Sequence, residues 1–420
     1  MANLRAPLLF VALALSPAAI AAPNAWTKCM HARPYRIVEV GNDTIVSGEY
    51  YGGGDLGDGK ARGHSALFVA RYGAKGEILW EYAVSGRVDI KDLAVDTNGS
   101  VILVGDAYEA IDFGAGSTPL LSSYEDAWIA SLGKDGKLQW AKRYGKPGGY
   151  NELSAVTVSA TEISATAKVA YGTDLGAGPI GKPKTNKDET QLLRVRWGRD
   201  GKLIDAKPTK DEQVPGKPSL RRDEEGDAPR VTTLSYDDGA HKWKSSFDNS
   251  GRGISGTAVL GPTGGAYTAG SFEYELELDA KHRLETPQVS PFIAAYGADG
   301  ALQWASAFGA GATSHDNAWI DEIAFASSGS ILVGGPAYGT FKIDGKPVAS
   351  IPNPPTLTSV NDDKDTGFVA ALGADGKVKW ARSYPARVGK VAAGQHIVVV
   401  YGHDAGPDQQ CIAHDSGLPE

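Results

Sequence analysis

A chain of 420 residues exceeds the usual size of one compact hydrophobic core, so either several domains or an array of repeats is expected. Its 53 glycines, together with plentiful aromatic and β-branched residues and no long apolar helical face, indicate an all-β protein. The formal net charge of -8 is spread along the chain, and the absence of a basic stripe argues against nucleic-acid binding.

The first segment has the features of an export signal. Arg5 precedes an apolar run from Pro7 to Ala19, and Ala19-Ile20-Ala21 offers the small residues that a signal peptidase accepts. We therefore expect residues 1–22 to be removed and the protein to be secreted or periplasmic. An uncleaved membrane anchor and a lipidated Cys29 are the alternatives. No later segment approaches the roughly 18 apolar residues of a membrane-spanning helix, so no transmembrane segment is predicted.

A tryptophan-centred motif then recurs along the chain, each time after a glycine-rich turn. Asp-Gly in such a turn tolerates the positive backbone angles of a tight hairpin, so each turn with its flanking stretches predicts two antiparallel strands. The clear copies are Leu79-Trp80, Leu138-Gln139-Trp140-Ala141, Leu302-Gln303-Trp304-Ala305 and Val378-Lys379-Trp380-Ala381, and the weaker copies are Leu203-Ile204-Asp205-Ala206-Lys207 and His241-Lys242-Trp243-Lys244.

A second strand pair precedes each of these hairpins, most clearly over residues 92–105 and 322–334. One unit is therefore four strands in two hairpins, repeated about every sixty residues. Such a unit cannot bury its own faces, and radial stacking of the units solves this problem. We predict an all-β, seven-bladed β-propeller over residues 23–420. Its tryptophans are expected on the outermost strands, packed between neighbouring blades.

The two ends of the chain are predicted to share one blade. Residues 391–401 and 411–414 supply three strands but no tryptophan motif, whereas Ala25-Trp26-Thr27-Lys28-Cys29 imitates that motif at the other end. Pairing the two ends closes the ring and leaves no unpaired edge. Cys29 and Cys411, which are the only cysteines, lie in these segments, so we expect a disulfide between them in an oxidising compartment. Two buried free thiols are the alternative.

The order of the motifs resembles the bacterial seven-bladed β-propeller repeat family, abbreviated SBBP. Its middle element, Asp-(Leu/Phe)-Gly-x-Gly, occurs at 55–59, 112–116 and 174–178, and the likeness covers most of the chain except residues 211–230. The Asp-Gly-Lys-x-x-Trp stretches are also similar to the docking motif of propellers of the pyrroloquinoline-quinone type, which include the outer-membrane assembly scaffold BamB. These resemblances imply a shape and an envelope location more than a chemistry.

Candidate binding residues lie in the connections that enter the blades, at the mouth of the central channel. A polar or cationic ligand could bind there, although a solvated, hydrogen-bonded loop is the alternative. The candidates are Asp89 and Asp92 before the second blade, Tyr150, Asn151 and Glu152 before the third, and His315, Asp316, Asp321 and Glu322 before the sixth. The longer connections at 182–188 and 350–365 are candidate partner surfaces.

No catalytic residue, metal site or cofactor is predicted. The eight histidines are scattered without zinc-ligand spacing, and no nucleophile elbow or phosphate loop is found. The Asp-(Leu/Phe)-Gly-x-Gly segments lack the succession of oxygen ligands that calcium requires, so they are interpreted as turns.

We therefore expect a monomeric, non-enzymatic propeller that binds a protein, a glycan or a small polar ligand at one rim. The alternatives are a BamB-like scaffold subunit of an envelope assembly and a hydrolase or lyase propeller with an acidic site at the channel mouth.

Overall fold

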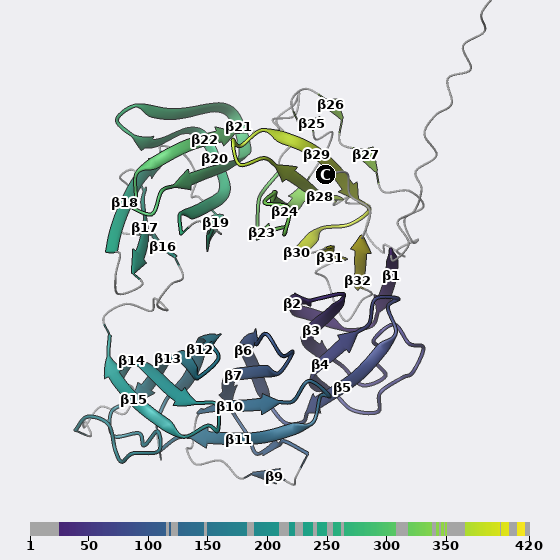
Figure 1. The fold of residues 1–420 in the computed structure, drawn as a ribbon, viewed down its shortest axis with the longest axis vertical. Coiled ribbons are helices and arrows are strands. Elements are labelled where there is room, and N and C mark those ends of the chain that lie inside the picture. Colours follow the sequence, from purple (N-terminus) through teal and green to yellow (C-terminus); the bar gives the residue numbers. More distant parts are fainter. Residues whose placement is uncertain are drawn as a thin grey trace, which may run out of the picture.

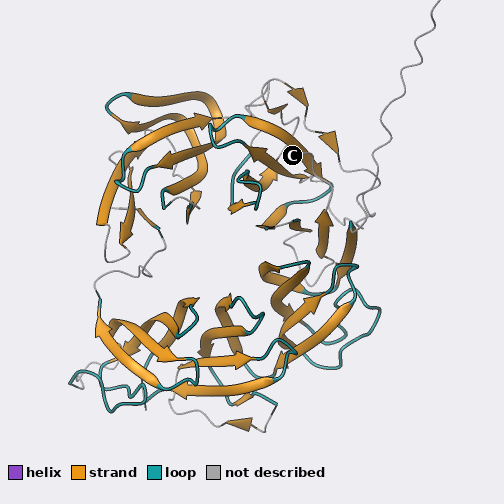
Figure 2. Ribbon diagram, viewed as in Figure 1, coloured by secondary structure: helices purple, strands orange, loops and turns teal. Residues whose placement is uncertain are grey.

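The structure is a computed structural model that describes residues 25–114, 117–118, 125–146, 149–182, 189–209, 218–222, 230–237, 242–249, 255–261, 264–307, 318–337, 342–343, 346–347, 349–350, 366–394, 396–402 and 410–415. Figure 2 shows this part as strands and loops, without a helix. Accordingly, the described part holds no helix with the length and apolar character needed to cross a membrane. The proposed signal peptide, residues 1–22, lies outside the described residues, as do most of the two long connections.

The strands form a ring of seven antiparallel blades around a central axis, so the predicted propeller is confirmed (Figure 1). In each of the first three blades the chain runs from the innermost strand to the outermost. Blade 1 holds β2 (Arg33–Val40), β3 (Asp43–Tyr50), β4 (Ala66–Tyr72) and β5 (Ile78–Val84). Blade 2 holds β6 (Val88–Val95), β7 (Val101–Ala107), β10 (Asp126–Leu132) and β11 (Leu138–Tyr144). Blade 3 holds β12 (Asn151–Val158), β13 (Glu162–Ala170), β14 (Thr190–Gly198) and β15 (Leu203–Pro208).

Blades 4 and 5 are joined into one sheet of seven strands. Blade 4 contributes three described strands, β16 (Ser219–Arg222), β17 (Arg230–Asp237) and β18 (Lys242–Asn249). Blade 5 holds β19 (Ser255–Leu260), β20 (Ala266–Asp279), β21 (His282–Tyr296) and β22 (Leu302–Ala307). The hairpin of β20 and β21 is long, and Leu276 and Glu277 near its tip pair with Asn249 and Asp248 of β18. This extension therefore ties the short fourth blade to the fifth.

The last blades close the ring. Blade 6 holds β23 (Glu322–Phe325), β24 (Ile331–Ala337), β28 (Thr366–Leu372) and β29 (Val378–Tyr384), with the short β27 (Ala349–Ser350) added in parallel. Blade 7 holds β30 (Val388–Ala393), β31 (Ile397–Gly402), β32 (Gln410–Asp415) and, from the other end of the chain, β1 (Trp26–Met30). Two further sheets have two short strands each. One pairs β8 (Ile111–Asp112) with β9 (Ser117–Thr118), and the other pairs β25 (Lys342–Ile343) with β26 (Lys346–Pro347).

The predicted sharing of one blade by both ends is confirmed. Figure 1 shows β1 beside β32, and Cys29 stands directly opposite Cys411 in their register. The two cysteines form a disulfide that spans 382 residues of sequence. Five register pairs, from Trp26 to Met30, therefore hold the ring together in addition to one covalent link.

A repeated contact joins the blades, in which the tryptophan of one outermost strand packs on the glycine of the next blade's outer hairpin. The glycine of this hairpin has a positive φ, 76° at Gly136, which is why Asp-Gly recurs there. A Cβ added to Gly136 would lie 2.5 Å from the indole of Trp80, so only glycine leaves room for the contact. The described contacts are Trp26 on Gly76, Trp80 on Gly136, Trp140 on Gly201, Trp243 on Gly300 and Trp304 on Gly376.

Apolar clusters fill six junctions between blades. They join blade 1 to 2, 2 to 3, 4 to 5, 5 to 6, 6 to 7 and 7 to 1. Among the described residues, no such cluster joins blade 3 to blade 4. Blade 3 has Arg194 and Arg196 on β14, where the preceding blade has Ile129 and Ser131 in register positions of the same kind. The ring is therefore held by apolar packing everywhere that the structure describes except at the junction of blades 3 and 4.

Candidate functional site

A cavity of about 550 Å³, which we call the axial cavity, lies against the innermost strands of four neighbouring blades. The innermost strands of blades 1, 2, 6 and 7 supply most of its wall, namely β2, β6, β23 and β30, and Figure 1 places all four beside the centre. Charged side chains dominate the lining. The basic residues are Arg33, Arg36, Lys91, Arg387 and Lys390, and the acidic residues are Asp89, Asp321 and Glu322. Within the lining, five basic groups face three acidic groups, and two further acids, Asp92 and Asp106, pair with Arg36 and Lys91 from outside it.

Three of the strands that line this cavity contain a β-bulge. In β2, β6 and β30 the register against the second strand of the blade shifts by one residue. The extra residues are Tyr35, Lys91 and Gly389, and all three line the cavity. Because a bulge leaves one residue out of the ladder and bends the strand, it turns side chains that would otherwise follow the regular alternation. The three bulges thus place Tyr35, the ammonium group of Lys91 and the open backbone of Gly389 at one site.

Three ion pairs cross between neighbouring blades at or beside the cavity wall. In each pair a basic side chain of blade 1 or 7 reaches an acid of the adjacent blade. All six side chains retain some exposure, from 14% at Asp92 to 44% at Arg36, so each pair can exchange its partner with a ligand from solution. The pairs are Arg36 with Asp92 at 3.5 Å, Arg387 with Asp321 at 3.1 Å, and Lys390 with Glu322.

Lys91 links the cavity to a buried acid outside it. Its Nζ lies 3.4 Å from Oδ2 of Asp89 on the cavity side and 3.3 Å from Oδ2 of Asp106 behind it. Burial and the neighbouring Glu125 carboxyl raise the pKa of Asp106 to about 8, against the attraction of Lys91. Burial likewise raises the pKa of Glu322, against the attraction of Lys390. Glu322 in the cavity wall and Asp106 behind it are thus carboxyl groups that are costly to ionise.

No protein-family model and no curated protein matches the sequence. Some solved structures align with most of this chain, at low sequence identity. The β-propeller domain of the Trilobed protease from Pyrococcus furiosus aligns with a TM-score of 0.41 and 7% identity, covering 92% of this chain and 94% of that one. The polysaccharide lyase Uly1 gives a TM-score of 0.41 and 9% identity over 91% and 89% of the two chains. A member of the DUF4221 family from Bacteroides vulgatus gives 0.31 and 10% over 94% and 96%.

The predicted site residues divide into those that line the axial cavity and those that do not. Asp89, Asp321 and Glu322 line it. Asp92 lies beside it, paired with Arg36, and its Oδ2 also accepts a hydrogen bond from the backbone N of Val156 at 2.9 Å. His315 and Asp316, which form the centre of the predicted cluster, lie outside the described residues.

The three candidates before blade 3 have different surroundings from one another. Tyr150 is exposed, with 48% of its surface accessible. Asn151 is fully buried and structural, because its Nδ2 donates to the backbone O of Glu125 at 2.9 Å and its Oδ1 accepts from the hydroxyl of Thr173 at 2.8 Å. Glu152 lies with Asp106 and Glu125 in a group of three carboxyls. The Asp-(Leu/Phe)-Gly-x-Gly segments at 55–59 and 174–178 are turns, as predicted: Oδ1 of Asp55 accepts three backbone hydrogen bonds, and Oδ1 of Asp174 accepts two.

The basic residues of the cavity were not singled out by the search for motifs. The repeat itself contains a signal for them, since the innermost strands of blades 1 and 7 both begin with two basic residues three positions apart. The two stretches are Arg33-Pro34-Tyr35-Arg36-Ile37 and Arg387-Val388-Gly389-Lys390-Val391. Aligning the innermost strands with one another, and not only the tryptophan motifs, would have found these four basic side chains.

Proposed function

We propose that this protein is an exported, non-enzymatic β-propeller that binds a small anionic ligand in its axial cavity. The observation that carries the proposal is the lining of the cavity, where Arg33, Arg36, Lys91, Arg387 and Lys390 outnumber the three acids. Its volume of about 550 Å³ lies within the range of pockets that hold small molecules.

The chemistry of the basic groups favours a carboxylate or a phosphate. A guanidinium group presents a rigid fork of donors that matches either anion in a two-pronged contact, which an ammonium group cannot do. Arg33 and Arg387 stand at the start of the innermost strands of two adjacent blades. Arg387 already holds one carboxylate, that of Asp321, at 3.1 Å. A ligand carboxylate in the cavity would compete for the same donors.

Export forms the second part of the proposal. It is supported by the apolar leader over residues 1–22 and by a disulfide, because disulfides persist in oxidising compartments. The resemblance of the repeat to the SBBP family agrees with a secreted or periplasmic location. Mass spectrometry of the protein recovered from its host would test this part, and a chain that still began at Met1 would contradict it.

Binding can be tested on the full chain by calorimetry with three probes, citrate, galacturonate and inorganic phosphate. We expect at least one probe to bind to the unmodified protein. Arg33→Gln and Arg387→Gln should each weaken that binding about 10- to 100-fold, because each removes a charged hydrogen-bond donor. Arg283→Gln is the matched control: Arg283 is 54% exposed on the β21 strand, where it pairs with Glu275 away from the cavity. Equal binding by all three variants would contradict the proposal.

A further inference from the structure

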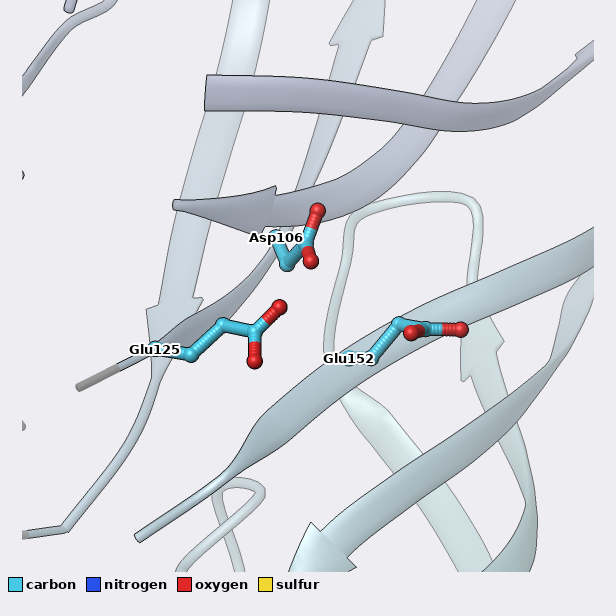
Figure 3. A group of neighbouring side chains, drawn as sticks. All are labelled: Asp106, Glu125 and Glu152. Atoms are coloured by element: carbon cyan, nitrogen blue, oxygen red, sulfur yellow. The ribbon is translucent and has the colours of Figure 1, made fainter. Parts of the chain in front are cut away.

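Three carboxyl groups meet between blades 2 and 3, beside the axial cavity but not in its lining. Asp106 ends the second strand of blade 2, Glu125 precedes its third strand, and Glu152 lies on the innermost strand of blade 3 (Figure 3). One oxygen of each lies within 4.8 Å of one oxygen of both others. Three atoms spaced in this way share a point no more than about 2.8 Å from all of them, close to the 2.3–2.6 Å of calcium–oxygen bonds.

Two of the three carboxyls are buried with an oxygen that has no partner. Asp106 is fully buried and Glu125 is 2% exposed. Among the described residues, Oδ1 of Asp106 and Oε2 of Glu125 are buried without a hydrogen bond. Figure 3 shows these two carboxyl groups facing each other. A buried carboxyl oxygen without a partner is costly, so an arrangement that leaves two of them together calls for a cation or a proton between them.

The backbone of the site is fixed from both sides. The indole Nε1 of Trp128 donates to the backbone O of Asp106 at 2.9 Å. Nδ2 of Asn151 donates to the backbone O of Glu125 at 2.9 Å. These two contacts hold the acids in place through residues that are themselves fully buried. The site is therefore built by the fold and does not depend on mobile surface side chains.

The local charges leave room for a divalent cation. With all three carboxyls ionised the group carries three negative charges, and Lys91, 3.3 Å from Oδ2 of Asp106, supplies one positive charge. The neighbouring Asp126 and Arg143 are paired at 2.7 Å and balance each other, while Asp89 lies on the far side of Lys91. The hydroxyl of Tyr108 contacts the same oxygen of Asp106 at 3.3 Å.

We propose that Asp106, Glu125 and Glu152 form a calcium site that locks blade 2 to blade 3 beside the axial cavity. Three carboxylates without histidine or cysteine suit a hard cation and not zinc. Ca²⁺ suits three carboxylates from separate segments better than Mg²⁺, because Mg²⁺ demands near-ideal octahedral geometry, whereas Ca²⁺ accepts flexible coordination.

The test uses the full chain after treatment with a chelator. Millimolar Ca²⁺ should raise the melting temperature by about 2–5 °C, because a ligand that binds only the folded state stabilises it. Tb³⁺ should replace Ca²⁺ and emit light on excitation of Trp128 or Tyr108, which contact Asp106 directly. Glu125→Gln should abolish both responses. Glu152→Gln, at a half-buried position, serves the same purpose if Glu125→Gln does not fold.

Glu162→Gln is the matched control, since Glu162 lies on the same blade as Glu152 but pairs with Arg196 at 3.0 Å. Its Ca²⁺ and Tb³⁺ responses should equal those of the unmodified protein. Two results would overturn the proposal. Absence of both responses in the unmodified chain would mean that Asp106 and Glu125 share a proton instead, and responses that persist in Glu125→Gln and Glu152→Gln would place the ion elsewhere.

Discussion

Asp205 pairs with Arg196 at 2.6 Å, at the register position where Trp140 and Ser131 stand in the preceding blade. Blade 3 therefore has an acid where its neighbours have the tryptophan that docks on the next blade. The acid is held within its own sheet, by Arg196 and by Lys207 at 2.9 Å, and it offers no apolar surface to blade 4. This substitution explains why no apolar cluster joins blades 3 and 4 in the described part of the ring.

Hydrogen exchange should find the ring weakest at this junction. Amides of β15, the outermost strand of blade 3, should exchange about 10-fold or more faster than those of β11, the outermost strand of blade 2, because local opening costs least where few apolar contacts hold the element. Both are outermost strands with one partner strand, so the comparison is matched. Equal protection of β11 and β15 would contradict a weak junction between blades 3 and 4.

The tryptophan contact can be separated from backbone strain by two glycine substitutions. Gly136 and Gly59 have nearly the same positive φ, 76° and 73°, but only Gly136 faces an indole. Gly59→Ala should cost about 1 kcal/mol of unfolding free energy through strain alone. Gly136→Ala should cost about 2–4 kcal/mol, because its Cβ would also displace Trp80. Urea denaturation measures both, and equal losses would remove the indole contact as a stabilising element.

Because the disulfide closes the ring, replacing both cysteines should strongly lower the free energy of unfolding. Cys29→Ser with Cys411→Ser releases a loop of 382 residues, for which the loop-entropy relation gives roughly 5 to 6 kcal/mol as an upper limit. The denaturation midpoint should therefore fall well below that of the oxidised protein, while the β1–β32 pairing still forms. An unchanged midpoint, or free thiols at Cys29 and Cys411 in mass mapping under non-reducing conditions, would contradict this role.

The free energy of unfolding should depend on pH through Asp205. The hydrogen bond from Arg196, with help from Lys207, holds the pKa of Asp205 below its usual value. A lowered pKa in the fold means that the contribution of Asp205 is present above about pH 4 and is lost as the pH falls further. Asp205 is 23% exposed, so the contribution is at most about 1 kcal/mol.

The variant Asp205→Asn should thus be less stable than the unmodified protein near neutral pH, and the difference should shrink as the pH is lowered below about 4. The difference in unfolding free energy, measured in urea at a series of pH values, gives the answer. A difference that stays constant into the acid range would mean that the charge of Asp205 contributes nothing.

The ring could be predicted from local signals because they repeat. Each Asp-Gly turn sets one hairpin, and each tryptophan marks one outermost strand. Trp26 near the N-terminus supplies the outermost strand that the last three strands of the chain lack. The weak copy at 203–207 was visible as well, although its consequence for the junction with blade 4 depends on what Asp205 contacts in three dimensions.

The sites were harder to predict, because they depend on irregularities and on long-range proximity. Nothing in the order of residues shows that β6 bulges at Lys91, yet this bulge turns Lys91 between the cavity and Asp106. Asp106 and Glu125 lie nineteen positions apart, one on β7 and the other just before β10, and neither forms a motif with Glu152. Alignment of the second strands offered one hint, since Asp106 follows Gly105 as Glu49 follows Gly48 in blade 1.

The most direct test of the account is a crystal structure of the full chain soaked in selenate, whose selenium gives an anomalous signal. If the axial cavity is an anion site, the strongest peak should lie inside it, within hydrogen-bonding distance of Arg33 or Arg387. Peaks confined to the outer surface, with only water between β2, β6, β23 and β30, would contradict the central claim.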